Sequence, residues 1–246
     1  MDRFSILSAN FNKLAFIQQS IKSVLDQSFK NWEYIIIDDF SDDGSYEYLQ
    51  TLKDDRIQVI RNTERKYCSS CYATALRSAT GTICGILDAD DTLVPEAIEK
   101  IVGLYKKFPV MDFIYTQHFW CDVALKNCRT GLSARPREKL SLADMAKKGI
   151  HCFSHWRTFR RALADKQELF PDGLRYSVDK SLGFNLEEVG RGGFYPERLY
   201  YYRYYKGNMS RVFAAEQKKT TLQLAKQHLR KRENLGIKIQ PIVLLR

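Results

Sequence analysis

The sequence predicts an α/β fold in which an open, mostly parallel sheet is covered by helices on both faces. Two observations lead to this prediction. Strand-like and helix-like segments alternate at short intervals over the first 90 residues, which is typical of an open α/β sheet. In addition, segment 33–38, EYIIID, is a continuous apolar run of strand length that ends in an acid, as expected of a parallel strand buried on both faces.

The expected elements follow one another in a regular order. Segment 4–9, FSILSA, is β-rich, and apolar residues at spacings of one, three and four predict a helix over 16–25. After the strand at 33–38, the turn FSDDGS contains Gly44, the residue best suited to a positive φ. The later elements are expected as a helix at 46–52, a strand at 57–61, a helix at 72–79, a strand at 82–87, a helix at 95–108, a strand at 111–116 and a helix at 141–148.

Composition excludes several classes of protein. No apolar run among the 246 residues approaches the roughly 20 residues of a membrane-spanning helix. The N-terminal segment MDRFSILSANFNK lacks the order of a secretory signal. Six irregularly spaced cysteines favour reduced thiols over a disulfide framework, and the pair Cys68 and Cys71 has no second CxxC that would complete a zinc site. We therefore expect a cytoplasmic protein.

The net charge of +10 is concentrated near the C-terminus. Between Lys206 and Arg246, ten Lys and Arg face two Glu, a balance of +8. Leu222, Ala225 and Leu229 form one helical stripe among these basic residues. Such a helix could lie on an anionic membrane at its inner face, or pack on its own domain with a solvated basic face. Nucleic acid is not expected, because no recognised module accompanies the charge.

The stretch GILDADDTLVP, residues 85–95, places three carboxylates directly after an expected strand. Asp88, Asp90 and Asp91 would lie at the carboxyl end of the sheet, where open α/β sheets bind ligands. Carboxylate oxygens are the ligands that Mg²⁺ and Mn²⁺ prefer. The alternative is a set of solvated acids that cap the helix beginning near Pro95.

These motifs together resemble the nucleotide-binding half of family 2 glycosyltransferases of the GT-A fold. The resemblance covers 1–115 through FSILSANFNK, EYIIIDDFSDDGS and GILDADDTLVP, and continues more weakly through YSVDKSLGFNLEEVG and YYRYYKGNMSR. It implies a GT-A domain over 1–213, in which 1–115 binds the nucleotide and 116–213 forms the acceptor side and a closing loop. The basic helical extension would then occupy 214–246.

The activity that the resemblance implies is metal-dependent transfer of a sugar with inversion. The donor would be a nucleotide sugar, preferably a UDP-sugar, and the acceptor a glycan or lipid-linked glycan in surface polysaccharide synthesis. A non-catalytic sugar-nucleotide binding protein is one alternative. A nucleotidylyltransferase is another, but such enzymes normally carry a Gly-rich loop where this chain has SANFNK.

The resemblance also assigns residues to the donor site. It implies Asp90 as the main ligand of Mn²⁺ or Mg²⁺ and Asp88 as a ligand of the metal or of the ribose. Phe11 would stack on the base, and Asp39 would accept a hydrogen bond from it. The residues expected beside this pocket are Ser8 and Asn10. Many relatives carry Arg-Asn where this chain has Tyr72 and Ala73, and the candidates to replace that pair at the phosphates are Arg65, Lys66 and Arg77.

A general base for the acceptor hydroxyl is implied at Asp179. One carboxylate behind the acceptor suffices for this role. Relatives commonly show Glu-Asp at this point, and Val178 replaces the first acid. A helix cap is the alternative role of Asp179, and Glu187 and Glu188 are the reserve candidates for the base.

The remaining assignments concern the acceptor and a lid. His155 is expected near the acceptor, and Trp156 either stacks on an acceptor sugar or belongs to the core. In YRYYKGNMSR the basic residues Arg203 and Arg211 offer charge for phosphate, and Tyr205 stands where many relatives have a His. We expect this segment to order over the donor as a lid; an exposed basic loop is the alternative.

Overall fold

The structure is a computed structural model, and it describes residues 3–131, 133–137 and 140–246. Residues 1–2 of the N-terminal segment interpreted above lie outside the described residues. The strands are β1 (Phe4–Asn10), β2 (Trp32–Asp38), β3 (Ile57–Arg61), β4 (Ile83–Ile86), β5 (Thr92–Leu93), β6 (Phe113–Cys121), β7 (Arg129–Thr130), β8 (Arg157–Arg160), β9 (Gly192–Arg203) and β10 (Val243–Leu244). The helices are α1 (Leu14–Leu25), α2 (Ser45–Gln50), α3 (Tyr67–Ser78), α4 (Ala97–Lys107), α5 (Leu142–Lys147), the 3₁₀ helix Arg161–Asp165, α6 (Val178–Val189), α7 (Met209–Val212) and α8 (Ala214–Leu235).

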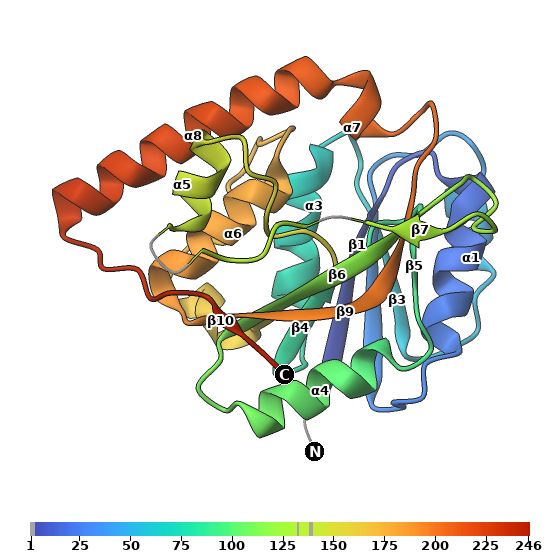
Figure 1. The fold of residues 1–246 in the computed structure, drawn as a ribbon. Helices are drawn as coiled ribbons and strands as arrows, with labels where there is room; N and C mark the ends of the chain where they lie inside the picture. The colour runs from blue at the N-terminus through green and yellow to red at the C-terminus, as the bar shows by residue number, and fades with distance from the viewer. Residues whose placement is uncertain (1–2, 132, 138–139) are drawn as a thin grey trace.

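One mixed, mostly parallel sheet forms the centre of the molecule (Figure 1). Its strands follow the order β10-β9-β6-β8-β4-β1-β2-β3, with β5 paired to β9 and β7 paired to β6. The predicted α/β class is confirmed. Strands β1, β2, β3 and β4 are parallel to their neighbours in this half, so their carboxyl ends meet at one edge.

The first half of the chain agrees closely with the expected elements. All seven residues of β2 are buried, and Gly44 has φ +88°, as predicted. Helix α3 begins at Tyr67, five residues earlier than expected. The Asp39 carboxylate causes this early start, because it accepts hydrogen bonds from the backbone N–H groups of Lys66 and Tyr67. Such a cap comes from a distant strand end and leaves no local sequence signal.

The sequence pattern did not predict the strands β7, β8, β9 and β10 of the second half, and two of them shape the sheet. Strand β8 lies antiparallel between β4 and β6, and the long strand β9 runs parallel to β6. Both are held by partners far away in the sequence. They extend the sheet beyond the parallel half and carry side chains to the same edge as β4.

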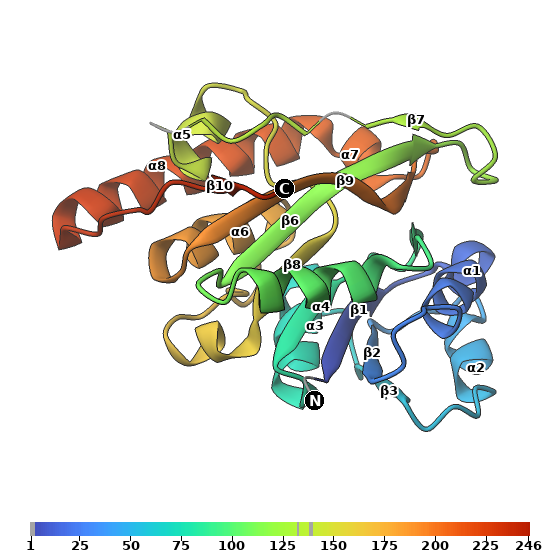
Figure 2. The same cartoon turned by 60° about the horizontal axis from the view of Figure 1, so that its bottom comes forward.

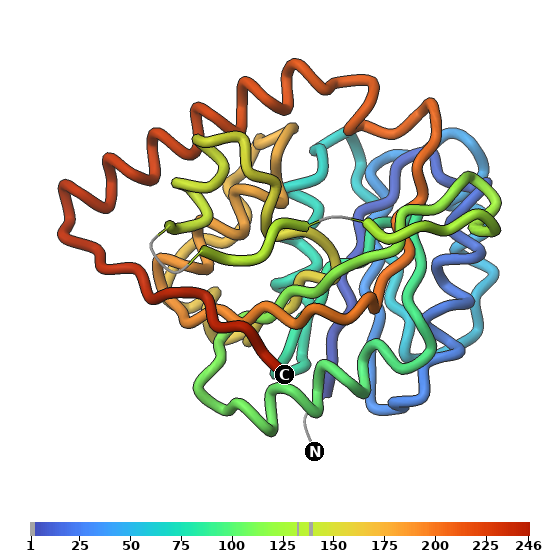
Figure 3. Tube along the Cα trace, in the orientation of Figure 1, coloured from blue at the N-terminus to red at the C-terminus, as the bar shows by residue number. Residues whose placement is uncertain are grey.

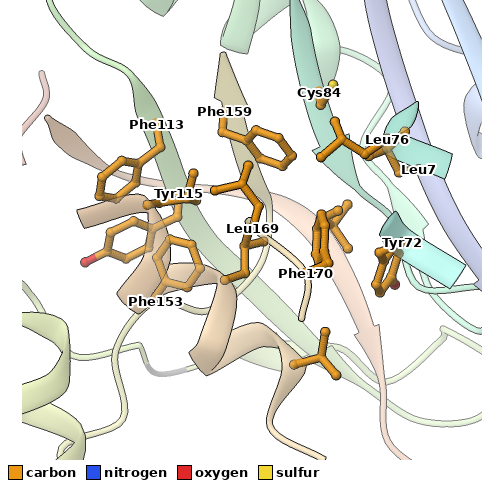
Figure 4. Close-up of a cluster of buried hydrophobic side chains, with 14 of the residues drawn as sticks. Leu7, Tyr72, Leu76, Cys84, Phe113, Tyr115, Phe153, Phe159, Leu169 and Phe170 are labelled. Carbon is orange, nitrogen blue, oxygen red and sulfur yellow. The ribbon is translucent and has the colours of Figure 1, made fainter. Parts of the chain in front are cut away.

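Helices cover both faces of the sheet. On one face α1, α2 and α4 bury an apolar cluster against β1 and β2, and Figure 2 shows α4 across this face. On the other face α3, α5 and α6 bury a second cluster, which includes the aromatic groups of Phe113, Tyr115, Phe153 and Phe159 (Figure 4).

The C-terminal extension packs on the rest of the chain. Helix α8 lies across α5 and α6 (Figure 1), and Ala225 is fully buried there. After Gly236 the chain returns along this layer and adds β10 to β9, as the trace in Figure 3 shows. The apolar stripe therefore faces the protein itself, which is the second of the two expected arrangements. No described helix is both long enough and apolar enough to cross a membrane.

The cysteines correct one prediction. Cys121 and Cys128 form a disulfide, so the expectation of six reduced thiols is wrong for this pair. The β6–β7 hairpin pairs Trp120 with Arg129, which brings the two flanking cysteines together. Cys68 and Cys71 are free, and burial raises the pKa of both thiols, which disfavours thiolate chemistry at this CxxC.

Candidate active site

A cleft of about 1510 Å³ opens at the carboxyl ends of β1, β2 and β4. One wall carries the strand-end residues of the first half, and the opposite wall is built from α5, α6 and the beginning of α8. Of the predicted site residues, the cleft is lined by Asn10, Phe11, Asp39, Asp88, Asp90, His155 and Asp179.

Asp88 is held by two side chains, one from helix α3 and one from strand β8. Tyr72 Oη donates to its Oδ1 at 2.6 Å, and Arg157 Nη2 donates to its Oδ2 at 3.2 Å. Tyr72 thus contacts the acidic motif from the position where the resemblance implies Arg. Arg157 comes from β8 and is 4% exposed. It is the cation beside Asp88, whereas the expected phosphate contacts Lys66 and Arg77 lie outside the cleft lining.

Asp90 makes a different set of contacts. Lys13 Nζ donates to its Oδ2 at 2.7 Å, and Tyr205 Oη donates to the same oxygen at 2.7 Å. Burial lowers the pKa of Lys13, but the charge of Asp90 and the hydrogen bonds to Asp90 and Tyr205 outweigh burial and raise it. Lys13 is therefore a stable cation at the carboxylate that the resemblance assigns to the metal.

Asp91 and His155 complete a possible metal group with Asp88. One ligand atom from each of the three lies within 4.8 Å of the others. Two carboxylates and an imidazole suit Mn²⁺, and the carboxylates suit Mg²⁺, so the donor chemistry fits a divalent cation. Asp91 is buried and accepts hydrogen bonds from Tyr200 Oη at 2.8 Å and from the backbone of Arg203 at 2.7 Å.

The predicted base pocket lies beside the acidic group. Phe11 is half-buried, and the guanidinium carbon of Arg65 lies 3.4 Å from its ring centroid. Asp39 accepts hydrogen bonds from Asn62 and from two backbone N–H groups of the α3 start, and its Oδ2 also lies 3.5 Å from Arg65 Nε.

The two other predicted pocket residues are buried in the strand ends. Ser8 contacts Tyr34 Oη at 2.8 Å and donates to the carbonyl of Leu87, and it lies outside the cleft lining. Asn10 reaches the cleft, but its Nδ2 donates to Asp38, Ser41 and Ser45. These contacts join β1, β2 and β4, so both residues position the cleft wall.

Asp179 lies in the first turn of α6 and faces the same cleft. Burial raises the pKa of its carboxyl group, but the charges of Lys180, Arg157 and His151 outweigh burial and lower it. The closest approaches are 3.2 Å to Lys180 Nζ and 3.8 Å to Arg157 Nη1. The N-cap residue of α6 is Ser177, so the cap alternative does not describe Asp179.

The reserve candidates for the base are engaged elsewhere. Glu187 and Glu188 pair with Arg232 of α8, and their side chains are each 1% exposed. Both lie outside the cleft lining. Their role is to attach α8 to α6, which is a structural role.

The acceptor and lid residues fall into two groups. His155 stacks between Tyr200 and Tyr202 at the cleft, and Tyr205 reaches Asp90. Trp156 is fully buried and stacks on Phe4. Its position agrees with the expected role in the core and disagrees with contact to an acceptor sugar.

The two arginines of the expected lid also differ from each other. Arg203 is 1% exposed and donates to Gln19 Oε1 and to the carbonyl groups of Asp90 and Val123. It braces the acidic turn and has no free charge for phosphate. Arg211 is exposed on α7 and lies against the ring of Tyr204, outside the cleft lining.

Sequence reasoning missed three residues that organise this site: Lys13, Tyr72 and Arg157. The carboxylate partners of Lys13 and Arg157 lie 77 and 69 positions away in the sequence. Only their proximity to expected strand ends could have drawn attention to them.

The comparisons agree with this fold and this cleft. Residues 5–167 match the family described as Glycosyl transferase family 2. This match covers more than half of the chain, and the chain belongs to that family. A curated relative from Escherichia coli, UDP-Glc:alpha-D-GlcNAc-diphosphoundecaprenol beta-1,3-glucosyltransferase WfgD, is 28% identical over 151 residues, which cover 61% of this chain and 58% of the relative.

Two solved structures show the same architecture. S. aureus TarS in complex with UDP-GlcNAc has a TM-score of 0.67 at 15% identity and matches over 94% of this chain and 72% of its own. The mannosyltransferase PcManGT from Pyrobaculum calidifontis, in complex with GDP-Man and Mn²⁺, has a TM-score of 0.62 at 17% identity over 96% of this chain and 76% of its own. The predicted GT-A fold is thereby confirmed. The matched region spans 39% to 58% of the length of four curated relatives.

Proposed function

We propose that this protein is a metal-dependent, inverting glycosyltransferase that uses a nucleotide-sugar donor, preferably a UDP-sugar. The observation that carries the proposal is the position of Arg157. Its guanidinium lies 3.2 Å from Asp88 and 3.8 Å from Asp179, so the acidic motif and the proposed base share one cleft. UDP-sugars are also named for the E. coli relative and the S. aureus structure.

The donor half of the cleft supports binding of a nucleoside diphosphate. Phe11 and Asp39 line the cleft, and a base would stack on Phe11 and donate to Asp39 in place of Arg65, which contacts both side chains. Asp88 and Asp90 would hold Mn²⁺ or Mg²⁺, with Asp91 and His155 close to Asp88. A bound divalent cation would supply neutralising charge for the departing diphosphate.

Asp179 is the proposed general base. Its neighbours Lys180 and Arg157 keep the carboxylate ionised, which is the form that accepts a proton. The acceptor oxygen forms its bond to the anomeric carbon while its proton passes to Asp179. The bond from that carbon to the phosphate oxygen breaks, and its electron pair leaves with the nucleoside diphosphate. A single displacement of this kind inverts the anomeric centre.

The other half of the cleft suits a lipid-linked or free glycan acceptor. Two exposed cations, Arg175 and Lys218, stand at its margin, where they would meet a diphosphate. The lining also contains apolar side chains that are partly exposed, among them Ala146, Ile150, Phe213 and Leu222, and these would contact an isoprenoid chain. The E. coli relative is named for a diphosphoundecaprenol acceptor.

An anionic membrane surface is the proposed partner of α8. Since the apolar stripe of α8 packs inward, contact with the membrane would be electrostatic, through the exposed residues Lys218, Lys219, Lys226 and Arg230. Sedimentation with phosphatidylglycerol vesicles, but not with phosphatidylcholine vesicles, is expected at low salt and should weaken as salt rises. Equal sedimentation with both would contradict this contact. A cytoplasmic location at the inner face of the membrane belongs to the same proposal.

The donor site is tested by calorimetric titration of UDP, GDP and CDP with and without Mn²⁺. We expect one nucleotide to bind in a manganese-dependent manner. Binding should be lost in Asp90→Asn and kept in Asp26→Asn, a matched change at an exposed ion pair with Lys22. If no nucleotide binds in either condition, or if both variants behave alike, the proposed donor site is wrong.

A further inference from the structure

Three side chains from distant segments meet at one carboxylate oxygen in the cleft. Lys13 precedes α1, Asp90 follows β4, and Tyr205 follows β9. The Lys13 ammonium lies 2.7 Å from Asp90 Oδ2 and 2.6 Å from Tyr205 Oη, and Tyr205 Oη donates to the same Asp90 oxygen at 2.7 Å. Each pair is therefore within hydrogen-bond distance.

The three contacts are shielded from solvent, unlike the surface ion pairs of the chain. The side chains of Lys13 and Asp90 are 22% and 14% exposed. In the pair formed by Lys22 and Asp26, one α-helical turn apart, the corresponding values are 74% and 52%. Charge interactions are screened less as burial increases, so the pair at Asp90 is the stronger of the two.

Tyr205 connects this pair to the segment 204–208, which we call the 204–208 loop. The ring of Tyr205 packs against Phe16 of α1 with centroids 4.8 Å apart. Within the loop, Asn208 is buried and donates through Nδ2 to the carbonyl of Arg203 at 3.0 Å. Tyr205 Oη therefore links the loop to Asp90 and to Lys13.

A divalent cation at Asp90 would meet the ammonium of Lys13. Two cations cannot share one carboxylate oxygen at these distances without strong repulsion. Asp88 and Asp91 lie beside Asp90 and belong, with His155, to the group whose ligand atoms could hold a metal, while Arg157 lies 3.2 Å from Asp88. A metal that binds this group and also takes Asp90 as a ligand must displace the lysine.

We propose that Lys13 is a built-in cation of Asp90 that competes with the divalent metal, and that the exchange of Lys13 for metal releases Tyr205 and the 204–208 loop. This inference rests on the proposed metal-assisted donor site. It assigns to Lys13 a positioning role, because Lys13 acts through Asp90 and Tyr205.

The test is the affinity for Mn²⁺ alone, without nucleotide, measured by the electron paramagnetic resonance signal of free Mn²⁺. Lys13→Met keeps the aliphatic stem and removes the charge, and Lys13 makes no side-chain cap to α1. We expect Lys13→Met to bind Mn²⁺ about tenfold more tightly than the native chain. Lys13→Arg, which keeps the charge, and Lys22→Met, which removes an exposed charge, should bind like the native chain.

The second readout is amide hydrogen exchange in 204–208. Mn²⁺ should accelerate exchange in the native protein, and Lys13→Met should show the faster exchange before metal is added. Equal or weaker Mn²⁺ affinity in Lys13→Met, or unchanged exchange on metal addition, would overturn the inference. These outcomes leave the donor site intact if manganese-dependent nucleotide binding persists, whereas loss of all nucleotide binding would refute the proposed function itself.

Discussion

Removal of the Arg232 charge should weaken the attachment of α8 to the wall of the cleft. Arg232 Nη2 lies 2.6 Å from Glu187 Oε1, and its Nε lies 3.2 Å from Glu188 Oε1. The side chains of all three are nearly inaccessible, with 6% exposure for Arg232 and 1% for each glutamate. Arg232→Met would leave both carboxylates buried with fewer partners.

The size of the effect follows from what remains after the change. Breaking a buried ion pair by removing one partner costs about 3–5 kcal/mol. Glu187 would keep the backbone N–H groups of Leu142 and Ala143, and Glu188 would keep His228 and Lys231. We therefore expect a loss near the lower limit, about 3 kcal/mol. In a chain of this size that corresponds to a fall in Tm of about 6–12 °C.

Thermal unfolding followed by circular dichroism at neutral pH measures this effect. Arg230→Met is the matched control, since Arg230 is exposed on the same helix and the change in charge is identical. Its Tm should stay within about 2 °C of the native value. The double variant Glu187→Gln/Arg232→Met should recover part of the loss, because it leaves one fewer unpaired charge. If Arg232→Met and Arg230→Met unfold at the same temperature, buried charge does not hold α8 in place.

Three further predictions concern the cleft and the pH dependence of stability. Asp179→Asn should lower sugar transfer by about 10²–10⁴-fold and leave nucleotide binding unchanged in calorimetry; unchanged transfer would support a non-catalytic binding protein. Phe11→Ala should weaken nucleotide binding by about tenfold or more through lost stacking, whereas Phe40→Ala, at a 49% exposed ring outside the cleft lining, should not; equal effects would argue against a base at Phe11. Burial raises the pKa of Glu188, but hydrogen bonds from His228 and Lys231 outweigh burial and lower this pKa from 4.5 to about 2. Glu188 therefore contributes about 3 kcal/mol to the free energy of unfolding above pH 4.5, and this contribution is lost as pH falls toward 2. Urea unfolding across this pH range should show the loss. Glu188→Gln should remove that part of the pH dependence.

The parallel half of the sheet was readable from local sequence. Strand β2 is an uninterrupted apolar run because both of its faces are covered, and Gly44 marks the turn that follows it. The acidic motif at 88–91 comes directly after β4, so its place at the carboxyl edge of the sheet followed from the order of the elements. These features depend on neighbours in the sequence, and short windows of sequence therefore contain them.

The contacts that shape the site depend on tertiary structure. Lys13 meets Asp90, and Arg157 joins Asp88 to Asp179, only because β1, β4, β8 and the start of α6 converge at one edge. Nothing in the local composition around Lys13 or Arg157 names these partners, since side-chain pairing across a sheet is decided by register and by the packing of distant elements.

The C-terminal helix illustrates the same division. The sequence by itself determined that 214–246 contains a basic amphipathic helix, because periodicity and charge are local properties. Only the tertiary structure decided which way its apolar stripe faces. The buried glutamates of α6 supply the partners that α8 needs, and apolar surface together with paired charge is buried where those two helices meet.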